Sequence, residues 1–536
     1  MKTTKLITPS KGIKGLFENW KSDAVSGFFV FILALPLSLG IAKASGFPPA
    51  MGVLSAMIGG LVTSFFNVSA LVIKGPAAGL ITVCAGAVAE FGGEMTGWKI
   101  AAGVIVVAAL IQIIFGFLKF GALSDFFPHS AIHGMLAAIG LIIIAKQIPV
   151  LLGDDPTMYK GEGPLELFMD IPRFVMASHW HIALVGIIGL IVLFVFPLFK
   201  ISIFKKLPLP FFVLLLTIPM ALIWHFKQTE PSYSLVTIGD FWGSISMNAD
   251  FSVIGTFAFW KYVFMFLFVG SLESLLTVKA TDNMDPYKRV SSYNGDLIGQ
   301  GVGNVFSGLM GGLPMISEVV RSSANVGFNA KTKWSNFFHG IFLLIAMLLM
   351  IPMIEMIPNS ALAAMLIFAG YRLAAPKEFI HTYKIGKEQL AIFLTTVVIT
   401  LAEDLLLGVA AGIIVKFLFH LYNGAKVSSL FKANYRLQTI DHKTILHIEQ
   451  SAIFSNLIGF KKALFDLPEA AHVIIDLSEA QIIDHSFMVF LHHFELEYNA
   501  HGGNLEINGL DKFRALSKHP MATRVKKHKR VKIAVK

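Results

Sequence analysis

The sequence predicts a mainly α-helical membrane protein that crosses the bilayer about fourteen times and ends in a small α/β domain. Of the 536 residues, 55% are hydrophobic and only 15% are charged, whereas soluble domains carry about 25% charged residues. The apolar residues come in runs of about twenty, the length that crosses a hydrocarbon core about 30 Å thick. Residues 100–120, 182–199 and 337–354 are such runs.

The formal charge of +10 indicates topology rather than nucleic-acid binding, because lysine and arginine stay on the cytoplasmic side of a membrane. Basic loops alternate with acidic ones along the chain. The basic loops carry Lys119, Lys279, Lys331, Arg372 and Lys384, and the acidic loops carry Glu90, Asp154, Glu230 and Glu403. This alternation requires an even number of spans. We therefore expect a multi-pass protein of the inner (plasma) membrane with both termini in the cytoplasm.

Hydropathy divides the chain into three predicted regions. Residues 1–22 form a polar, basic cytoplasmic segment, residues 23–424 form the transmembrane region, and residues 425–536 form a cytoplasmic domain. The transmembrane region contains two blocks of about seven spans, at 23–226 and 257–421. The C-terminal domain should contain strands at 444–449, 473–477 and 505–507 and helices at 457–465 and 486–498. It ends in a basic tail made of Arg524, Lys526, Lys527, Lys529, Arg530 and Lys532.

Two predicted spans are interrupted by glycine and proline at matching positions of the two blocks. The breaks are residues 74–79 (KGPAAG) and 311–314 (GGLP). Paired breaks are typical of an inverted repeat with discontinuous helices. Each break is expected to precede the N-terminus of a half-helix, where free N–H groups and the positive dipole end favour an anion. Ordinary kinks are the alternative, since membrane helices tolerate both residue types.

Four ionisable residues fall at these breaks or in a neighbouring span: Lys74, Glu273, Glu318 and Arg321. Ionised groups within a membrane are costly and usually mark a transport pathway. Two cations and two carboxylates are neutral without substrate. A bound anion could then be balanced by a proton on Glu273 or Glu318, or by a co-transported cation. The alternative is a structural role, with Lys74–Glu273 and Glu318–Arg321 as ion pairs.

The sequence has no motif for nucleotide binding, metal binding or nucleophilic catalysis. Its single cysteine, Cys84, excludes an internal disulfide framework. We therefore predict no enzyme activity, no catalytic residue, no metal and no cofactor. Transport would have to use an ion gradient, facilitated flow or a separate partner.

Several motifs resemble the SulP family of anion transporters, whose animal relatives include prestin. Residues 34–40 (ALPLSLG) are similar to that family's first span, and residues 299–312 to its ninth span and the entry to its tenth. Residues 321–332 resemble its tenth-span arginine motif. Residues 473–478 (VIIDLS), followed by 483–486 (IDHS), resemble a STAS domain. The resemblance covers nearly the whole chain.

The resemblance implies seven spans repeated in inverted orientation, a core domain that moves against a gate domain like an elevator, and a homodimer in the lipid bilayer. It places the substrate between the half-helices of spans three and ten, beside span eight and the proline of span one. The residues implied at this site are Pro36, Lys74, Gly75, Pro76, Ala77, Glu273, Thr277, Ser317, Glu318, Val319, Val320 and Arg321. Ser486 stands where related domains carry a phosphorylatable residue; a helix N-cap is the alternative.

Family members move sulfate, bicarbonate, chloride or dicarboxylates, by proton or sodium symport or by exchange. Sodium-driven bicarbonate members tend to have threonine where Lys74 stands and no arginine at Arg321. A fixed ammonium at Lys74 could replace a sodium ion, which favours a proton as the coupling ion. We predict secondary active transport of bicarbonate or sulfate. The alternatives are a nucleobase permease of the same fold, a sodium-driven bicarbonate symporter, and a membrane-anchored sensor whose spans are only a scaffold.

Overall fold

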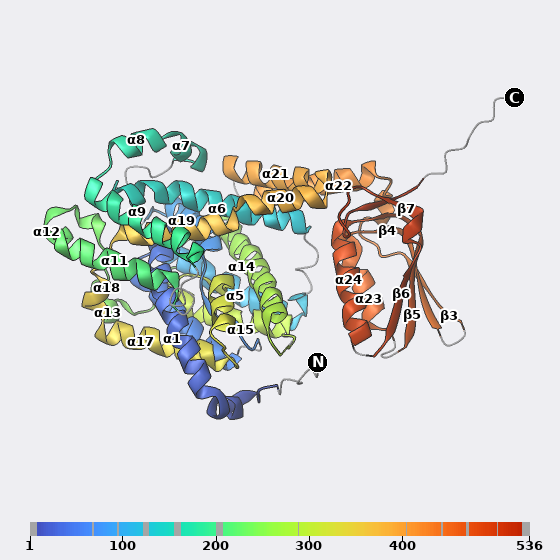
Figure 1. Cartoon of the computed structure of the whole chain (residues 1–536), viewed down its shortest axis with the longest axis horizontal. Coiled ribbons are helices and arrows are strands. Elements are labelled where there is room, and N and C mark those ends of the chain that lie inside the picture. The colour runs from blue at the N-terminus through green and yellow to red at the C-terminus, as the bar shows by residue number, and fades with distance from the viewer. Residues whose placement is uncertain are drawn as a thin grey trace. The chain divides into compact units, whose positions relative to one another are not determined.

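The computed structural model describes residues 8–66, 69–93, 96–121, 128–154, 162–199, 207–287, 289–403, 405–440, 443–467, 471–500 and 502–527. The chain forms two compact units: Met1–Gly121 with Ile139–Leu373, and Ala122–Ala138 with Ala374–Lys536. The first is helical, and the second combines helices with a C-terminal sheet (Figure 1). Three residues of the predicted basic tail, Lys529, Arg530 and Lys532, lie outside the described residues.

The first unit is built almost entirely from helices because its apolar runs satisfy their backbone hydrogen bonds internally, as a bilayer requires. Its α-helices are α1 (Gly12–Ala44), α2 (Pro49–Leu61), α3 (Thr63–Phe66), α4 (Ile81–Glu90), α5 (Gly97–Phe117), α7 (Pro164–Met169), α8 (Ile171–Met176), α9 (Trp180–Val195), α11 (Leu209–Ile223), α12 (Phe226–Thr229), α13 (Phe241–Ser244), α14 (Phe257–Met284), α15 (Tyr293–Leu309), α16 (Val319–Gly327), α17 (Trp334–Leu349), α18 (Ile351–Ile354) and α19 (Asn359–Leu373). Its short 3-10 helices are η1 (Ala78–Leu80), η5 (Phe196–Leu198) and η6 (Ser232–Ser234). Helix α6 (His129–Leu152) begins in the second unit and continues in the first.

In the described part of the chain, 7 helical segments are long and apolar enough to cross a membrane. They are Gly12–Ala44, Pro49–Phe66, Gly97–Phe117, His129–Leu152, Trp180–Leu198, Phe257–Asp282 and Leu405–Tyr422. Shorter apolar helices at Ala78–Glu90, Leu209–Ile223 and Trp334–Leu349 lie between them in the sequence. The prediction of a mainly helical, multi-pass membrane protein is confirmed, whereas the number of fourteen spans stays a prediction.

A pair of short strands lies at the two predicted breaks: β1 within the first break and β2 directly after the second. Strand β1 (Lys74–Pro76) pairs antiparallel with β2 (Met315–Ser317), with Lys74 opposite Ser317 and Pro76 opposite Met315. Both strands are fully buried. The backbone groups that the broken helices cannot satisfy therefore bond to each other across the two breaks. We call this strand pair the crossing.

The second unit contains three helices followed by the C-terminal sheet domain. The helices are α20 (Pro376–Ile385), α21 (Lys387–Ala402) and α22 (Leu405–Tyr422). The sheet domain consists of η7 (Val427–Ser429), β3 (Tyr435–Ile440), β4 (Lys443–Ala452), η8 (Phe454–Asn456), α23 (Leu457–Phe465), β5 (His472–Ile483), α24 (His485–Ala500), β6 (Asn504–Asn508), η9 (Leu510–Lys512), β7 (Phe513–Ala515) and β8 (Arg524–Lys526).

Strand β5 is the centre of the sheet. The strand order is β3-β4-β5-β8-β7, and β6 also pairs with β5. Strands β4 and β6 run parallel to β5, with Val473 opposite Thr444 and Leu505, whereas β8 is antiparallel to it. Helices α23 and α24 lie side by side on one face of the sheet (Figure 1). Their apolar residues, including Phe460, Phe487 and Leu491, form a common core with the inward residues of β4 and β5.

All five elements predicted for this domain are present. The three predicted strands correspond to β4, β5 and β6, and the two predicted helices to α23 and α24. Strands β3, β7 and β8 were not predicted. The alternating parallel strands and helices fit the STAS-like fold that the sequence indicates.

Candidate functional site

Two half-helices begin at the crossing, as the paired breaks predict. After β1 the chain enters η1 and α4, and after β2 it enters α16, whose N-cap is Glu318. The first N–H groups of a helix have no partner within the helix and carry the positive end of its dipole. Because β1 and β2 are antiparallel and have 3 residues each, the two half-helices start from opposite ends of one short strand pair. This geometry suits an anion.

The ammonium of Lys74 in β1 is surrounded by four side-chain oxygen atoms, which we call the oxygen cage. Its ammonium nitrogen is 2.7 Å from Asp296 Oδ2, 2.7 Å from Ser317 Oγ, 3.3 Å from Gln300 Oε1 and 3.4 Å from Ser274 Oγ. Both charged side chains are 0% exposed. The cage joins β1 and β2 to α14 and α15, so Lys74 fixes the crossing to the helices behind it.

This arrangement corrects one of the two predicted ion pairs. Lys74 pairs with Asp296 instead of Glu273. Asp296 was missed by the sequence reasoning, although a signal for it exists. It is the only charged residue between positions 293 and 309, and a lone carboxylate in a membrane helix needs a partner. Three carboxylates, those of Glu273, Asp296 and Glu318, therefore lie around the crossing, rather than two.

Arg321, in the first turn of α16, is the cation that stays available. Its side chain is 0% exposed. Nη2 donates to Ser38 Oγ of α1 and to the carbonyl of Pro76, both at 3.2 Å. Nη1 and Nε have no hydrogen-bond partner among the described residues. Buried guanidinium N–H groups rarely stay unpaired, so Arg321 has the capacity to bind a further acceptor.

Glu318 does not form the predicted side-chain pair with Arg321. Its carboxylate accepts a hydrogen bond from the backbone N–H of Arg321, with Oε2 2.9 Å from the nitrogen. Glu318 is thus the N-cap of α16, where a negative charge stabilises the helix dipole. In the described part of the chain no ion pair joins the Glu318 carboxylate to the Arg321 guanidinium.

Glu273 reaches the crossing from α14. Its side chain is 7% exposed, and Oε2 has no hydrogen-bond partner within the described ranges. The carboxylate lies against Gly79 at the start of the first half-helix, so close that a Cβ on Gly79 would overlap it. Thr277 lies one helical turn further along α14 and is also buried. The Glu273 carboxylate and the Arg321 guanidinium, which both have unused hydrogen-bonding capacity, therefore lie where the two half-helices begin.

The other predicted residues lie on the elements that surround these charges. Pro36 is buried in α1, two residues before Ser38. Gly75, Pro76 and Ala77 are buried at the start of the first half-helix, and Ser317 faces Lys74. Val319 is 37% exposed and Val320 is half-buried in the first turn of α16.

Two asparagine side chains form hydrogen bonds with backbone groups in or near the crossing. The sequence reasoning did not single them out. Asn336 of α17 accepts a hydrogen bond from the backbone N–H of Lys74 at 3.2 Å and donates to the carbonyl of Gly59 at 2.8 Å. Asn325 of α16 donates to the carbonyl of Leu71 at 2.8 Å. These amides satisfy backbone groups near the end of α2, just before β1 and in β1 itself.

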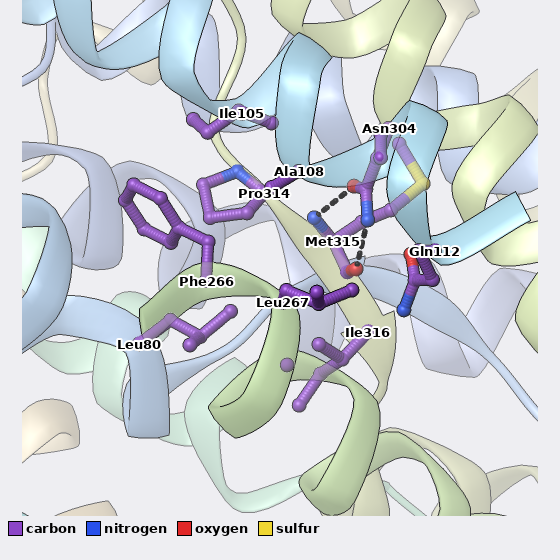
Figure 2. Close-up of a pocket in the computed structure, with 12 residues that line it drawn as sticks. Leu80, Ile105, Ala108, Gln112, Phe266, Leu267, Asn304, Pro314, Met315 and Ile316 are labelled. Carbon is purple, nitrogen blue, oxygen red and sulfur yellow. Dashed lines mark hydrogen bonds between the residues drawn. The ribbon is translucent and has the colours of Figure 1, made fainter. Parts of the chain in front are cut away.

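A small cavity lies beside the crossing but is not the predicted site. Its volume is about 10 Å³, the least that holds one water molecule. Figure 2 shows its mainly apolar lining, which includes Leu80, Phe266 and Ile316. Asn304 makes two hydrogen bonds to the backbone of Met315 there, at 2.7 and 3.0 Å, and so holds β2 in place. Neither Arg321 nor Glu273 lines this cavity.

The close approach of Gly75 to Arg321 leads to a first prediction. A Cβ at Gly75 would overlap Arg321 Nη1. The Gly75→Ala variant should therefore displace the guanidinium and slow anion uptake about tenfold, since small displacements in a preorganised site are costly. Gly255→Ala is the matched control, because no described atom lies within 4 Å of its added Cβ. Uptake by Gly75→Ala at the rate of the control would contradict the role given to Arg321.

Ser486, the predicted regulatory residue, lies in the first turn of α24. Its side chain is 2% exposed, and Oγ has no hydrogen-bond partner in the part of the chain that the structure describes. Asp484, not Ser486, caps the helix, because Asp484 Oδ1 accepts from Phe487 N at 2.8 Å. A modifying enzyme could reach Ser486 only after the contacts around it had opened.

Comparison with known proteins identifies the fold around this site. The chain is 25% identical to "Sulfate transporter 4.1, chloroplastic" from Arabidopsis thaliana over 534 residues, which is 92% of this chain and 76% of the relative. It is 25% identical to "Bicarbonate transporter BicA" from Picosynechococcus over 409 residues, 74% of this chain and 70% of the relative.

Two solved structures share the fold. The transmembrane domain of a cyanobacterial bicarbonate transporter, BicA, superposes with a TM-score of 0.63 at 22% identity, covering 74% of this chain and 98% of that one. SLC26A9 superposes with a TM-score of 0.65 at 16% identity, covering 92% and 85%. Residues 20–396 match the sulfate permease family. The predicted SulP resemblance is confirmed, and the chain belongs to the sulfate permease family of membrane anion transporters.

Proposed function

We propose that this protein is a secondary active transporter of a small inorganic anion, bicarbonate or sulfate, and that Arg321 binds the anion. The unpaired Nη1 and Nε of the buried Arg321 carry this proposal. The planar guanidinium stays charged, and these two nitrogens can donate hydrogen bonds to the oxygens of a carbonate or sulfate group. The relatives named for sulfate and for bicarbonate transport support both substrates.

The burial of Arg321 supports an elevator-like mechanism. Its side chain is 0% exposed, so an anion reaches it only if the surrounding helices move. Lys74 and its oxygen cage hold β1 and β2 together, which makes the crossing a rigid carrier. We propose that the crossing moves as one body with its half-helices, as the core of the transporter against a gate.

The charges of the site favour a proton, or exchange, over sodium. Lys74 is neutralised by Asp296, which leaves Arg321 with Glu273 and Glu318 at the half-helices. The ammonium of Lys74 has four oxygen neighbours within 3.4 Å and thus takes the place of a cation. Glu273 is then the group that can accept a proton when the anion binds, since its Oε2 is unused by any described residue.

Uptake into proteoliposomes tests this proposal and gives a second prediction. The purified protein should accumulate or exchange labelled bicarbonate or sulfate, with a rate that follows an imposed pH gradient or a counter-anion. Replacing sodium with choline on both sides should leave the rate unchanged. A sodium requirement would overturn the role of Lys74 but not anion transport. Failure of bicarbonate, sulfate and fumarate to move would contradict the proposal, and uptake of a nucleobase would favour the permease alternative.

The oligomeric state, the membrane and the orientation of the transporter are also proposals. We propose a homodimer in the inner (plasma) membrane with both termini in the cytoplasm, as the basic loops indicate. The C-terminal sheet domain would then lie in the cytoplasm. Mass photometry of the protein in lipid nanodiscs would measure the oligomeric state, and protease access in right-side-out vesicles would locate the termini.

A further inference from the structure

A second buried cluster of charges lies in the other unit, where α22 contacts the C-terminal sheet domain. Asp484 Oδ2 is 3.4 Å from Lys416 Nζ and 3.4 Å from His420 Nε2. Lys416 and His420 are one helical turn apart and therefore share one face of α22. The three side chains are at most 2% exposed. The anion site uses none of these residues.

Asp484 is held rigidly on the side of the sheet domain. It follows the central strand β5 and caps α24, with Oδ1 accepting from Phe487 N at 2.8 Å. Oδ2 accepts from Phe454 N at 3.0 Å. Burial alone would raise the pKa of Asp484, but the charge of Lys416 and the hydrogen bonds that it accepts hold this pKa below its ordinary value. The carboxylate is therefore ionised, and the ammonium of Lys416 on α22 is its charged partner.

Gln389 of α21 extends the cluster to two further elements. Its Oε1 accepts from Ser130 Oγ, in the first turn of α6, at 2.6 Å and from Lys416 Nζ at 3.5 Å. Its Nε2 donates to Thr523 Oγ1 of the sheet domain at 3.3 Å. Ser130, Gln389 and Thr523 are at most 4% exposed. A continuous buried polar network thus connects α6, α21 and α22 with the sheet domain.

Apolar contacts seal this network from water. The ring of Phe417, next to Lys416 on α22, is 5.5 Å from the ring of Phe431 and 5.1 Å from that of Phe454. Phe417 also packs on a core cluster of Ala425, Leu430, Ile453 and Ile482. In such surroundings, separating Asp484 from Lys416 would leave two charges buried without partners, which is strongly unfavourable.

We propose that Lys416, His420 and Asp484 form a latch that makes the sheet domain move as one body with α21 and α22, and that the rate of anion transport depends on the closed latch. Helices α21 and α22 pack closely, since a Cβ on Gly408 or Gly412 would overlap Thr400 or Thr396. A movement of this helix pair during transport must therefore carry the sheet domain along or break the latch. The transport half of this proposal rests on the proposed function, and the docking half does not.

A double-mutant cycle on the full-length protein tests the latch. Lys416→Met and Asp484→Asn each leave one buried charge without its main partner, and the double variant removes both charges. Hydrogen–deuterium exchange of the amides of residues 416–422 measures docking without any transport. Each single variant should speed this exchange about tenfold, and the double variant about tenfold rather than a hundredfold, because neighbours in one network are not additive. Initial rates of anion uptake should fall about tenfold in each single variant and by about the same factor in the double one, because the latch is absent in all three.

The matched control is an exposed ion pair on the same sheet domain, Arg436 with Glu479, 3.6 Å apart and 60% and 53% exposed. Arg436→Met and Glu479→Gln should change neither exchange nor uptake. Unchanged exchange at 416–422 in the latch variants would overturn the proposal, as would a parallel loss of protection in β5, which would show that the sheet domain unfolds. Faster exchange with normal uptake would overturn the dependence of transport on the latch. If the unmodified protein moves no anion, the proposed function fails while the exchange data still decide on docking.

Discussion

Replacing Arg321 with glutamine should abolish anion uptake while the protein stays folded. The guanidinium offers two nitrogens without a hydrogen-bond partner among the described residues, Nη1 and Nε, to the anion. Hydrogen bonds to charged groups contribute about 1.5–3 kcal/mol each, so the loss of two predicts a drop of about 100-fold or more in initial uptake rate. The rate would be measured in proteoliposomes with equal amounts of inserted protein, and thermal unfolding in detergent would verify the fold.

Arg321→Lys separates the role of the charge from that of the planar guanidinium. Lysine keeps a positive charge but has one ammonium nitrogen in place of the separate nitrogen donors of arginine. We expect an intermediate rate for this variant, between those of the unmodified protein and of Arg321→Gln. Uptake by Arg321→Gln at the unmodified rate would show that the anion binds elsewhere. A loss of the thermal transition in both variants would show instead that the contacts to Ser38 and Pro76 are mainly structural.

Replacing Lys74 with methionine should be the most destabilising single change at the crossing. Lys74 and Asp296 are both 0% exposed and 2.7 Å apart. Breaking a buried pair leaves an uncompensated charge, which typically costs about 3–5 kcal/mol. We expect a clear fall in the midpoint of thermal unfolding for Lys74→Met and for Asp296→Asn, measured by differential scanning fluorimetry in detergent.

The double variant Lys74→Met, Asp296→Asn is the control for this prediction. It removes both charges, so it should regain a large part of the stability that either single variant loses. Additive losses in the double variant would mean that the two residues act independently. Their short contact would then contribute little, and the proposal that Lys74 takes the place of a coupling cation would lose its support.

The membrane architecture could be predicted because its signals are local. Runs of apolar residues indicate spans wherever they occur, and the glycine–proline breaks at 74–79 and 311–314 predict a discontinuity without knowledge of any partner. In the structure, strand β1 within the first break pairs with β2, which directly follows the second. The partner of Lys74 could not be found in this way. Asp296 is 222 positions further along the chain, and no local pattern selects it over Glu273.

The dependence on local patterns also explains why three strands of the sheet domain were not predicted. Strands β4 and β5 alternate between buried and exposed residues or carry continuous apolar runs, and both were predicted. All six residues of β3 are exposed, so it has no buried face to produce a period of two. Strands β7 and β8 have 3 residues each, too few for a pattern. The contact of Lys416 with Asp484 is again a long-range pairing, which only the fold brings together.

Locating the bound anion would test the central claim most directly. Crystals grown with bromide, and separately with selenate, would show the position of either anion by anomalous scattering. We predict a peak within hydrogen-bond distance of Arg321 Nη1, beside the starts of α4 and α16. Peaks whose ligands exclude Arg321, with no density between the two half-helices, would contradict the proposal that the crossing holds the substrate.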